Sequence, residues 1–185
     1  MDKVNQNAKT KSGDINQTNL FINDKRSLSK TIIYNLLNII SESNIESNND
    51  YSLALPARID KKLVFNGAFR YKNIFLDYSG MLASFSRVIE DFPNSEKIVS
   101  KVHHIFILSV PLCKDGKPKA TEGDKQSENI KNKLLVIIRS DYRCQDNYYD
   151  EQIESFVYIL MLYCIEKCKI LINPNEMSNQ NDSSR

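Results

Sequence analysis

The sequence predicts a domain of the α/β (α+β) class, in which a mostly antiparallel sheet is flanked by helices. Two observations support this prediction. Segments with apolar residues at helical spacing stand near both ends and in the middle of the chain. Between them lie shorter segments that are alternating or continuously apolar, which is typical of strands. The expected order is helix, strand, strand, helix, helix, strand, strand, helix, and a sheet with helices on its faces accommodates it.

The first helix is expected directly after Ser27, a suitable N-cap residue, because the apolar residues that follow form one stripe. These residues are Leu28, Ile32, Ile33, Leu36, Leu37 and Ile40. Residues 51–55 then alternate between larger apolar and small side chains, and residues 63–69 (LVFNGAF) form a second apolar segment. Two such segments with a brief connection predict an antiparallel hairpin.

The middle of the chain is predicted to be helical. Apolar residues recur at helical spacing over residues 81–92, and Pro93 follows directly. A second, shorter helix is expected over residues 98–102, with Asn94 or Ser95 as its cap.

Two buried strands and a long helix are expected in the last third. Residues 104–112 and 133–141 are nearly continuous apolar runs, which favours strands buried on both faces. The polar residues between them (113–132) predict an exposed loop insertion. Asp150 is expected to cap a final helix that Pro174 brings to an end.

Length and composition fit one domain with polar ends. The chain has 185 residues, of which 41% are hydrophobic and 26% charged, and its formal net charge is +2. This near balance argues against a dedicated DNA-binding domain, so no nucleic-acid partner is expected. Many of its common residues, such as Asn and Lys, have AT-rich codons, which hints at a protist source.

Polar stretches without hydrophobic periodicity mark both ends of the chain. Residues 1–25 and 173–185 are predicted to be disordered tails around a folded domain of residues 26–172. The longest apolar run, Phe156 to Ile165, has half of the ~20 residues that a membrane-spanning helix needs, so no membrane insertion is expected. Sparse cysteines and a polar N-terminus favour a cytoplasmic location.

Four short motifs stand in the second half of the chain: Val110-Pro111, Asp115-Gly116, Leu135-Val136-Ile137 and Asp150-Glu151. Together they resemble the end of a GAF domain. The resemblance implies a GAF/PAS-like sheet with a small-ligand pocket between the sheet and the middle helices. The residues that it places near this pocket are Phe85, Phe92, Phe106, Leu108, Ile137 and Arg139.

Few residues point to catalysis, and most of them have a simpler structural role. His103 and His104 are neighbours that point apart on a strand, so a structural role is expected for both. Cys164 and Cys168 lie four apart on one helix face, but zinc needs further ligands, and no metal site is predicted.

We therefore expect a non-catalytic GAF-like interaction or scaffold subunit of a larger protein assembly, without a cofactor, and a cytoskeletal or ciliary complex is one reasonable setting. Tyr142, Tyr148 and Tyr149 share one loop and are expected to contact the protein partner, because rigid aromatic rings add contact area at little entropic cost. One alternative is a sensor of a nucleotide or metabolite bound in the GAF-type pocket. Another is a redox enzyme that uses Cys113 or Cys144.

Overall fold

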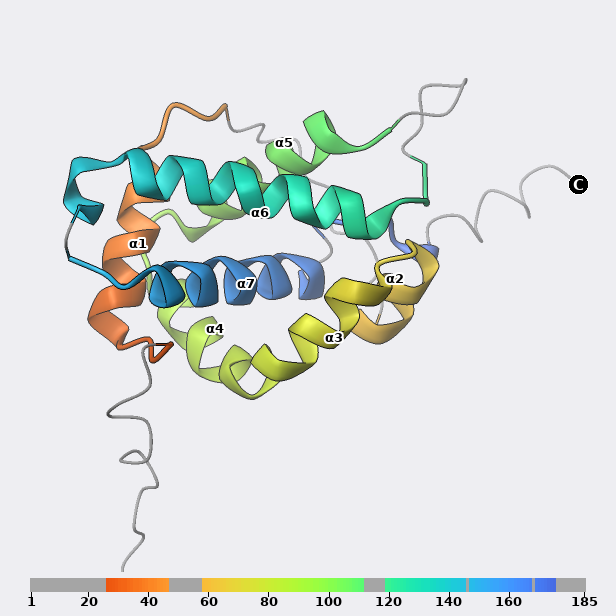
Figure 1. Cartoon of the computed structure of the whole chain (residues 1–185), viewed down its shortest axis with the longest axis horizontal. Helices are drawn as coiled ribbons and strands as arrows, with labels where there is room; N and C mark the ends of the chain where they lie inside the picture. The colour runs from red at the N-terminus through yellow and green to blue at the C-terminus, as the bar shows by residue number, and fades with distance from the viewer. Residues whose placement is uncertain (1–25, 47–57, 112–118, 146, 168, 176–185) are drawn as a thin grey trace, which may run out of the picture.

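The computed structural model describes residues 26–46, 58–111, 119–145, 147–167 and 169–175. Every regular element within these residues is a helix, so the fold is all-α (Figure 1). The α-helices are α1 (Lys30–Glu42), α2 (Ile59–Phe65), α3 (Phe69–Tyr78), α4 (Leu82–Glu90), α5 (Ser95–Ser109), α6 (Gly123–Ser140) and α7 (Asp150–Glu166). The described residues also include two short 3-10 helices. Of these, η1 (Ser79–Met81) joins α3 to α4, and η2 (Tyr142–Cys144) follows α6.

Helix α7 is the centre of the structure. Each residue from Ile159 to Ile165 is buried, as expected for a helix that is apolar on all sides. Helices α1 to α6 each contact α7. In Figure 1, α5 and α6 lie on one side of α7 and α3 and α4 on the other, while α1 crosses one end and α2 lies at the opposite end. The final helix expected from the sequence is confirmed, and the apolar run Phe156 to Ile165 lies within it.

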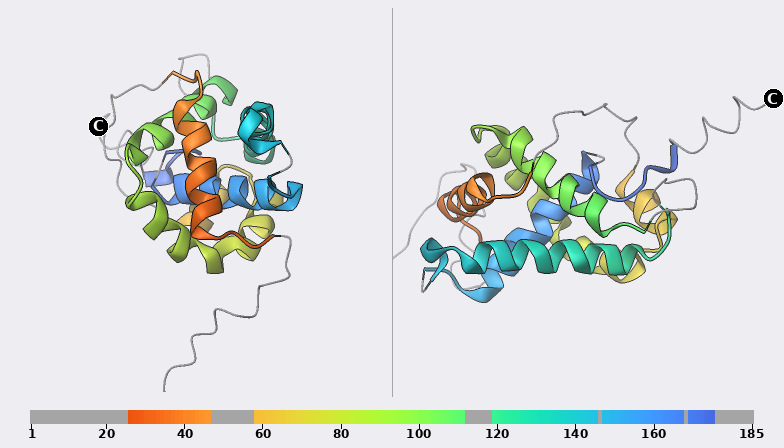
Figure 2. Two further views of the ribbon diagram at one scale, coloured as in Figure 1. Left: turned by 90° about the vertical axis from the view of Figure 1, so that its left-hand side faces the viewer. Right: turned by 90° about the horizontal axis from the view of Figure 1, so that it is seen from above.

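Helix α1 packs through the predicted stripe. Ile33, Leu36, Leu37 and Ile40 are buried, and Ser29, rather than Ser27, provides the N-cap by accepting a hydrogen bond from the backbone N–H of Ile32 at 3.2 Å. The left panel of Figure 2 looks at the end of the molecule that α1 crosses.

Helices α2 and α3 form a hairpin whose turn is fixed by polar contacts. Gly67 adopts a left-handed conformation with φ of 69°, which glycine accepts at little cost. The buried side chain of Asn66 donates to the carbonyl of Ile172 and accepts from the N–H of the same residue. Asp124 at the start of α6 accepts hydrogen bonds from two N–H groups in the first turn of α3. The hairpin is therefore attached both to α6 and to the segment after α7.

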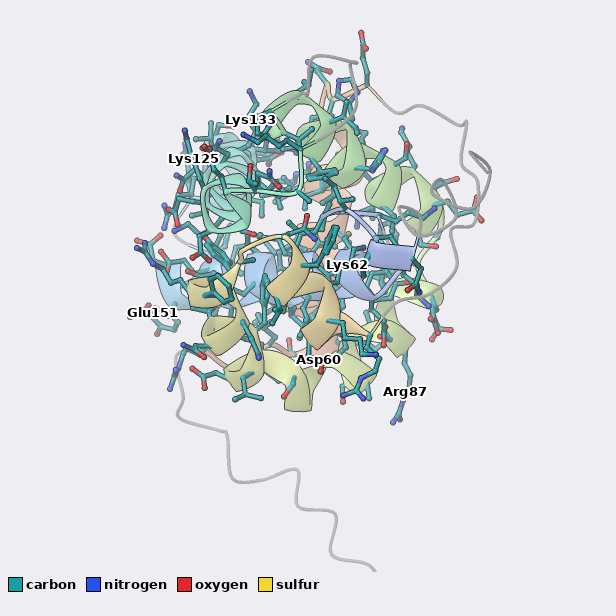
Figure 3. All side chains as sticks on the ribbon, turned by 90° about the vertical axis from the view of Figure 1, so that its right-hand side faces the viewer. Asp60, Lys62, Arg87, Lys125, Lys133 and Glu151 are labelled. Atoms are coloured by element: carbon teal, nitrogen blue, oxygen red, sulfur yellow. The ribbon has the colours of Figure 1, made fainter. Side chains whose placement is uncertain are left out.

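Two buried lysines lie at the C-terminal ends of helices. Lys101 of α5 donates from Nζ to carbonyl groups at the end of α1, and Lys62 of α2 donates to the carbonyl of Ile165 near the end of α7. A cation is favourable here because the last carbonyls of a helix are unpaired and carry partial negative charge. Figure 3 labels Lys62 and Asp60, which both belong to α2.

The α/β prediction is wrong because the segments assigned to strands are helical. Residues 104–109 belong to α5, and residues 133–140 belong to α6. Residues 63–69 contain the end of α2, the Gly67 turn and the first residue of α3. The GAF/PAS-like sheet is therefore absent from the described residues, whereas the predicted strand over residues 51–55 lies outside them.

Several boundaries also differ from the expectations. Residues 123–132 of the predicted loop insertion form the first half of α6. The expected short helix over residues 98–102 is part of the longer α5, whereas the helix expected over residues 81–92 is confirmed as α4. Asp150 is the first helical residue of α7, not its cap, and this helix ends at Glu166, well before Pro174.

Asn173, the first residue of the predicted C-terminal tail, is buried.

No helix among the described residues combines the length and the apolar character needed to cross a membrane.

Candidate functional site

A polar groove, here called the Tyr142 groove, lies between α1 and the connection from α6 to α7. Its volume is about 680 Å³. The residues that line it are Ser29, Thr31, Ile32, Asn35, Asn38, Ile39, Tyr142, Arg143, Asn147 and Tyr148. This set is rich in tyrosine and asparagine and contains one arginine, a composition typical of protein-binding surfaces.

Arg143 is held rigidly at one wall of the Tyr142 groove. Its Nε and Nη2 atoms donate to the two carboxylate oxygens of Asp141, each at 2.8 Å, and its Nη1 atom lies 2.7 Å from Oε2 of Glu42. The hydrogen bond from Arg143 is the main cause that lowers the pKa of Asp141. The connection after α6 is therefore joined to the end of α1 by a paired guanidinium, which fixes this wall before any partner arrives.

The three tyrosines predicted to contact a partner have different positions around the groove. The hydroxyl oxygen of Tyr148 accepts a hydrogen bond from Nδ2 of Asn35 at 3.1 Å, which links the connection to α1. The ring of Tyr142 is 77% exposed, and the guanidinium of Arg143 lies 5.8 Å from its centroid. Tyr149 is exposed but is not among the groove-lining residues. The structure thus brings two of the three predicted tyrosines to one surface.

The six residues placed near a GAF-type pocket lie on three different helices, α4, α5 and α6, and in the segment after α4. Phe85, Phe92 and Phe106 are buried in the core, where Phe85 packs against Phe156 and Tyr163 and Phe92 packs against Tyr34.

The other three residues of that set lie apart from them. Leu108 is exposed on α5, and Ile137 is partly buried on α6. Arg139 forms an ion pair with Asp150, with 2.9 Å between Nη2 and Oδ1. None of these six side chains lines the Tyr142 groove.

The cysteine and histidine side chains considered for catalysis have structural positions in the described part of the chain. Cys144 is buried, and burial raises the pKa of its thiol, so the reactive thiolate is disfavoured. Nδ1 of His103 makes a short hydrogen bond to the carbonyl oxygen of Lys169. Cys113 and the side chain of Cys168 lie outside the described residues. Within the described part of the chain, no cluster of three or more His, Cys, Asp or Glu residues has the arrangement of a metal site.

The sequence predicts the tyrosines of the Tyr142 groove but not the residues of α1 that line it. Thr31, Asn35 and Asn38 follow one another at spacings of four and three residues and therefore lie on one face of α1. This polar stripe was visible in the sequence as the face opposite the buried apolar stripe. Nothing in the sequence indicated which other segment would lie against it.

No protein-family model matches this chain, and no curated protein or solved structure is significantly similar to it.

Proposed function

We propose that this chain is a non-catalytic interaction module that binds a protein partner through the Tyr142 groove. The observation that carries the proposal is the exposed ring of Tyr142 beside a guanidinium held by two carboxylates. Tyrosine and arginine are the residues that most often dominate binding energy in interfaces. A wall that is ordered before binding loses little conformational entropy when the partner arrives.

The groove favours the main chain of a partner segment. Asn35 and Asn38 carry amide side chains, which offer both a donor and an acceptor and so match a peptide group. The carboxylates of Asp141 and Glu42 face the single guanidinium of Arg143, which leaves this edge with a net negative charge. A cationic side chain on the partner segment is therefore favoured at this edge.

Site-specific photocrosslinking tests the proposal. A photoreactive phenylalanine analogue at position 142 keeps an aromatic ring in the groove, and the same analogue at Val136 places the probe on the exposed face of α6, outside the groove. We expect one defined protein adduct in the source cells from position 142 and not from position 136.

Binding measurements with the captured protein complete the test. Replacing Tyr142 with Ala is expected to weaken binding by about tenfold or more, because central tyrosines of interfaces contribute on the order of 2 kcal/mol. Val136→Ala is expected to leave binding unchanged. The proposal is wrong if no adduct forms, if both positions give the same adducts, or if Tyr142→Ala binds the captured protein as tightly as the unchanged chain.

A further inference from the structure

Two basic residues precede Ser29, the N-cap residue of α1. Arg26 stands three positions before Ser29, and Lys25 stands four positions before it. Ser29 is the one Ser or Thr residue in the sequence with Arg at the third position before it, whereas Lys occupies that position before Ser12 and Ser100. Kinases select their substrates by such charge patterns, and basophilic kinases select Arg at this position. The segment therefore has the charge pattern of a basophilic kinase substrate.

The structure leaves the hydroxyl group of Ser29 accessible. Ser29 and Arg26 are both exposed, and Ser29 has extended backbone angles (φ −72°, ψ 159°) just before the first helical residue, Lys30. In Figures 1 and 2 the start of α1, in red, lies at the outer edge of the molecule. A kinase must take the proton of the acceptor hydroxyl, so it has to reach Oγ. The first turn of a helix frays at little cost, which lets the residues after Ser29 open into an active site.

Ser100 shows what exposure adds to the charge pattern. Lys97 stands three positions before Ser100, so a basic residue has the same spacing as at Ser29. Ser100, however, lies within α5 and is only 7% exposed. A kinase would have to unfold α5 to reach this hydroxyl group. The folded chain therefore presents the basic motif at Ser29 and withholds it at Ser100.

We propose that Ser29 is phosphorylated by a basophilic serine kinase, with Arg26 and Lys25 as the residues that the kinase recognises. The γ-phosphoryl group of ATP forms a bond to Oγ of Ser29 while its bond to the leaving ADP breaks, and the hydroxyl proton passes to the catalytic aspartate of the kinase. The product carries about 1.5 to 2 negative charges at neutral pH.

The phosphate group would stabilise the start of α1. The first turn of this helix contains no Asp or Glu, so no acidic side chain of that turn offsets the partial positive charge of its N–H groups. Lys30 adds a cation next to Ser29, and its exposed ion pair with Asp91 is long, at 3.9 Å. A phosphate group at this position can accept charged hydrogen bonds from N–H groups of the first turn.

The modification would also change the Tyr142 groove, because Ser29 is one of the residues that line it. Additional negative charge there would favour a cationic partner segment more strongly. This consequence rests on the proposed function, whereas phosphorylation of Ser29 needs no partner at the groove.

Phosphorylation of the full chain in vitro tests the proposal. The probe is calcium/calmodulin-dependent protein kinase II, which is basophilic, with ATP and Mg²⁺, and tandem mass spectrometry locates the phosphate. We expect phosphate on Ser29 and none on Ser100. Arg26→Ala should slow phosphorylation of Ser29 about tenfold or more, because a charged contact with the kinase is lost. Arg87→Ala removes an exposed arginine of α4 and is the matched control, which should be phosphorylated at an unchanged rate.

Two further measurements complete the test. The chain isolated from its source cells under phosphatase inhibition should carry the same phosphoserine. Thermal unfolding followed by circular dichroism should give a melting temperature about 1–4 °C higher for the phosphorylated chain than for the same sample after phosphatase treatment. This difference should shrink in 1 M NaCl, where charges are screened beyond about 3 Å.

The proposal is overturned if Ser29 carries no phosphate in vitro or in the isolated chain, or if Arg26→Ala is phosphorylated there as fast as the unchanged chain. A melting temperature that is unchanged or lower after phosphorylation would overturn the stabilisation of α1. Failure of the Tyr142 groove to capture a protein would not alter where the phosphate is found, so the two proposals fail separately.

Discussion

The Nζ atom of Lys101 lies 2.6 Å from the carbonyl oxygen of Ser41, although the two residues are far apart in the sequence. The same ammonium group donates to the carbonyls of Ile40 at 3.1 Å and Ser43 at 2.6 Å. Lys101 is only 1% exposed, so these carbonyls replace the water that a lysine side chain normally has. A buried cation on α5 thus completes the C-terminal end of α1.

Replacing Lys101 with Met should destabilise the fold by roughly 2–3 kcal/mol, because the carbonyls at the end of α1 lose charged hydrogen bonds while the aliphatic stem is retained. Urea unfolding followed by far-UV circular dichroism measures the effect, since the chain contains no tryptophan. Lys97→Met removes an exposed lysine from the same helix and should change stability by less than about 0.5 kcal/mol. Equal effects of the two substitutions would contradict the proposed role of Lys101.

His103 should make the stability of the protein depend on pH. Burial is the main cause that lowers the pKa of His103, and the nearby charges of His104 and Lys62 act in the same direction, against the hydrogen bond to Lys169. The unfolded chain binds a proton as the pH falls through about 6.5, where the folded state resists it. The free energy of unfolding should therefore decrease from that pH down to the lowered pKa of the folded state.

The His103→Gln variant tests this pH dependence. It should show a smaller decrease in unfolding free energy over the same pH range, measured by urea unfolding at a series of pH values. His104→Gln keeps His103 in place and should retain the decrease. A slope that is the same in His103→Gln as in the unchanged protein would assign it to other groups.

The strand predictions failed because exposed apolar residues hid the helical period. In α5 the buried residues include Ile98, Val102, Ile105 and Phe106, which follow helical spacing, but Ile107 and Leu108 are exposed. With these two residues included, the segment becomes a continuous apolar run with β-branched side chains, which resembles a buried strand. Burial against neighbouring helices decided the structure against local propensity.

The first half of α6 was predicted as a loop for the opposite reason, because buried polar residues interrupt its apolar face. It buries Gln126 and Ser127 together with Ile130, so polar residues occupy core-facing positions and the segment looked like a loop. The helices α1, α4 and α7 were predictable because their buried faces are apolar. That Tyr142 and Tyr148 share one loop can be read directly from the sequence. That this loop packs against α1 to form the Tyr142 groove depends on tertiary packing.

The Asn66 side chain should be important for holding the segment after α7. Its Nδ2 atom donates to the carbonyls of Lys62 and Ile172, both at 2.8 Å, and its Oδ1 atom accepts from the N–H of Ile172 at 2.9 Å. Asn66→Ala removes the partner of the Ile172 N–H and C=O groups, whereas the Lys62 carbonyl keeps its bond from the Asn66 backbone N–H. The substitution should cost about 2–3 kcal/mol. Hydrogen exchange should show faster exchange at Ile172. Asn73→Ala, at an exposed position of α3, is the control and should leave exchange at Ile172 unchanged.

The close approach of Gly123 to the hairpin turn gives a prediction with a matched control in the same chain. Its N–H donates to the carbonyl oxygen of Asn66 at 2.8 Å, and an added Cβ atom would lie 2.5 Å from this oxygen and 3.0 Å from Cβ of Ala68. A Cβ atom at Gly80 would have no heavy atom within 4 Å.

Gly123→Ala should therefore destabilise the fold by roughly 1–3 kcal/mol, because backbone atoms must move apart to admit the methyl group. Gly80→Ala should be neutral or slightly stabilising, since alanine restricts the unfolded chain without a clash. Urea unfolding of both variants measures the difference. If Gly123→Ala is as stable as Gly80→Ala, α6 does not lie against the turn between α2 and α3 as closely as described. A large loss confined to Gly123→Ala would instead establish that the start of α6 and this turn form one tightly packed unit.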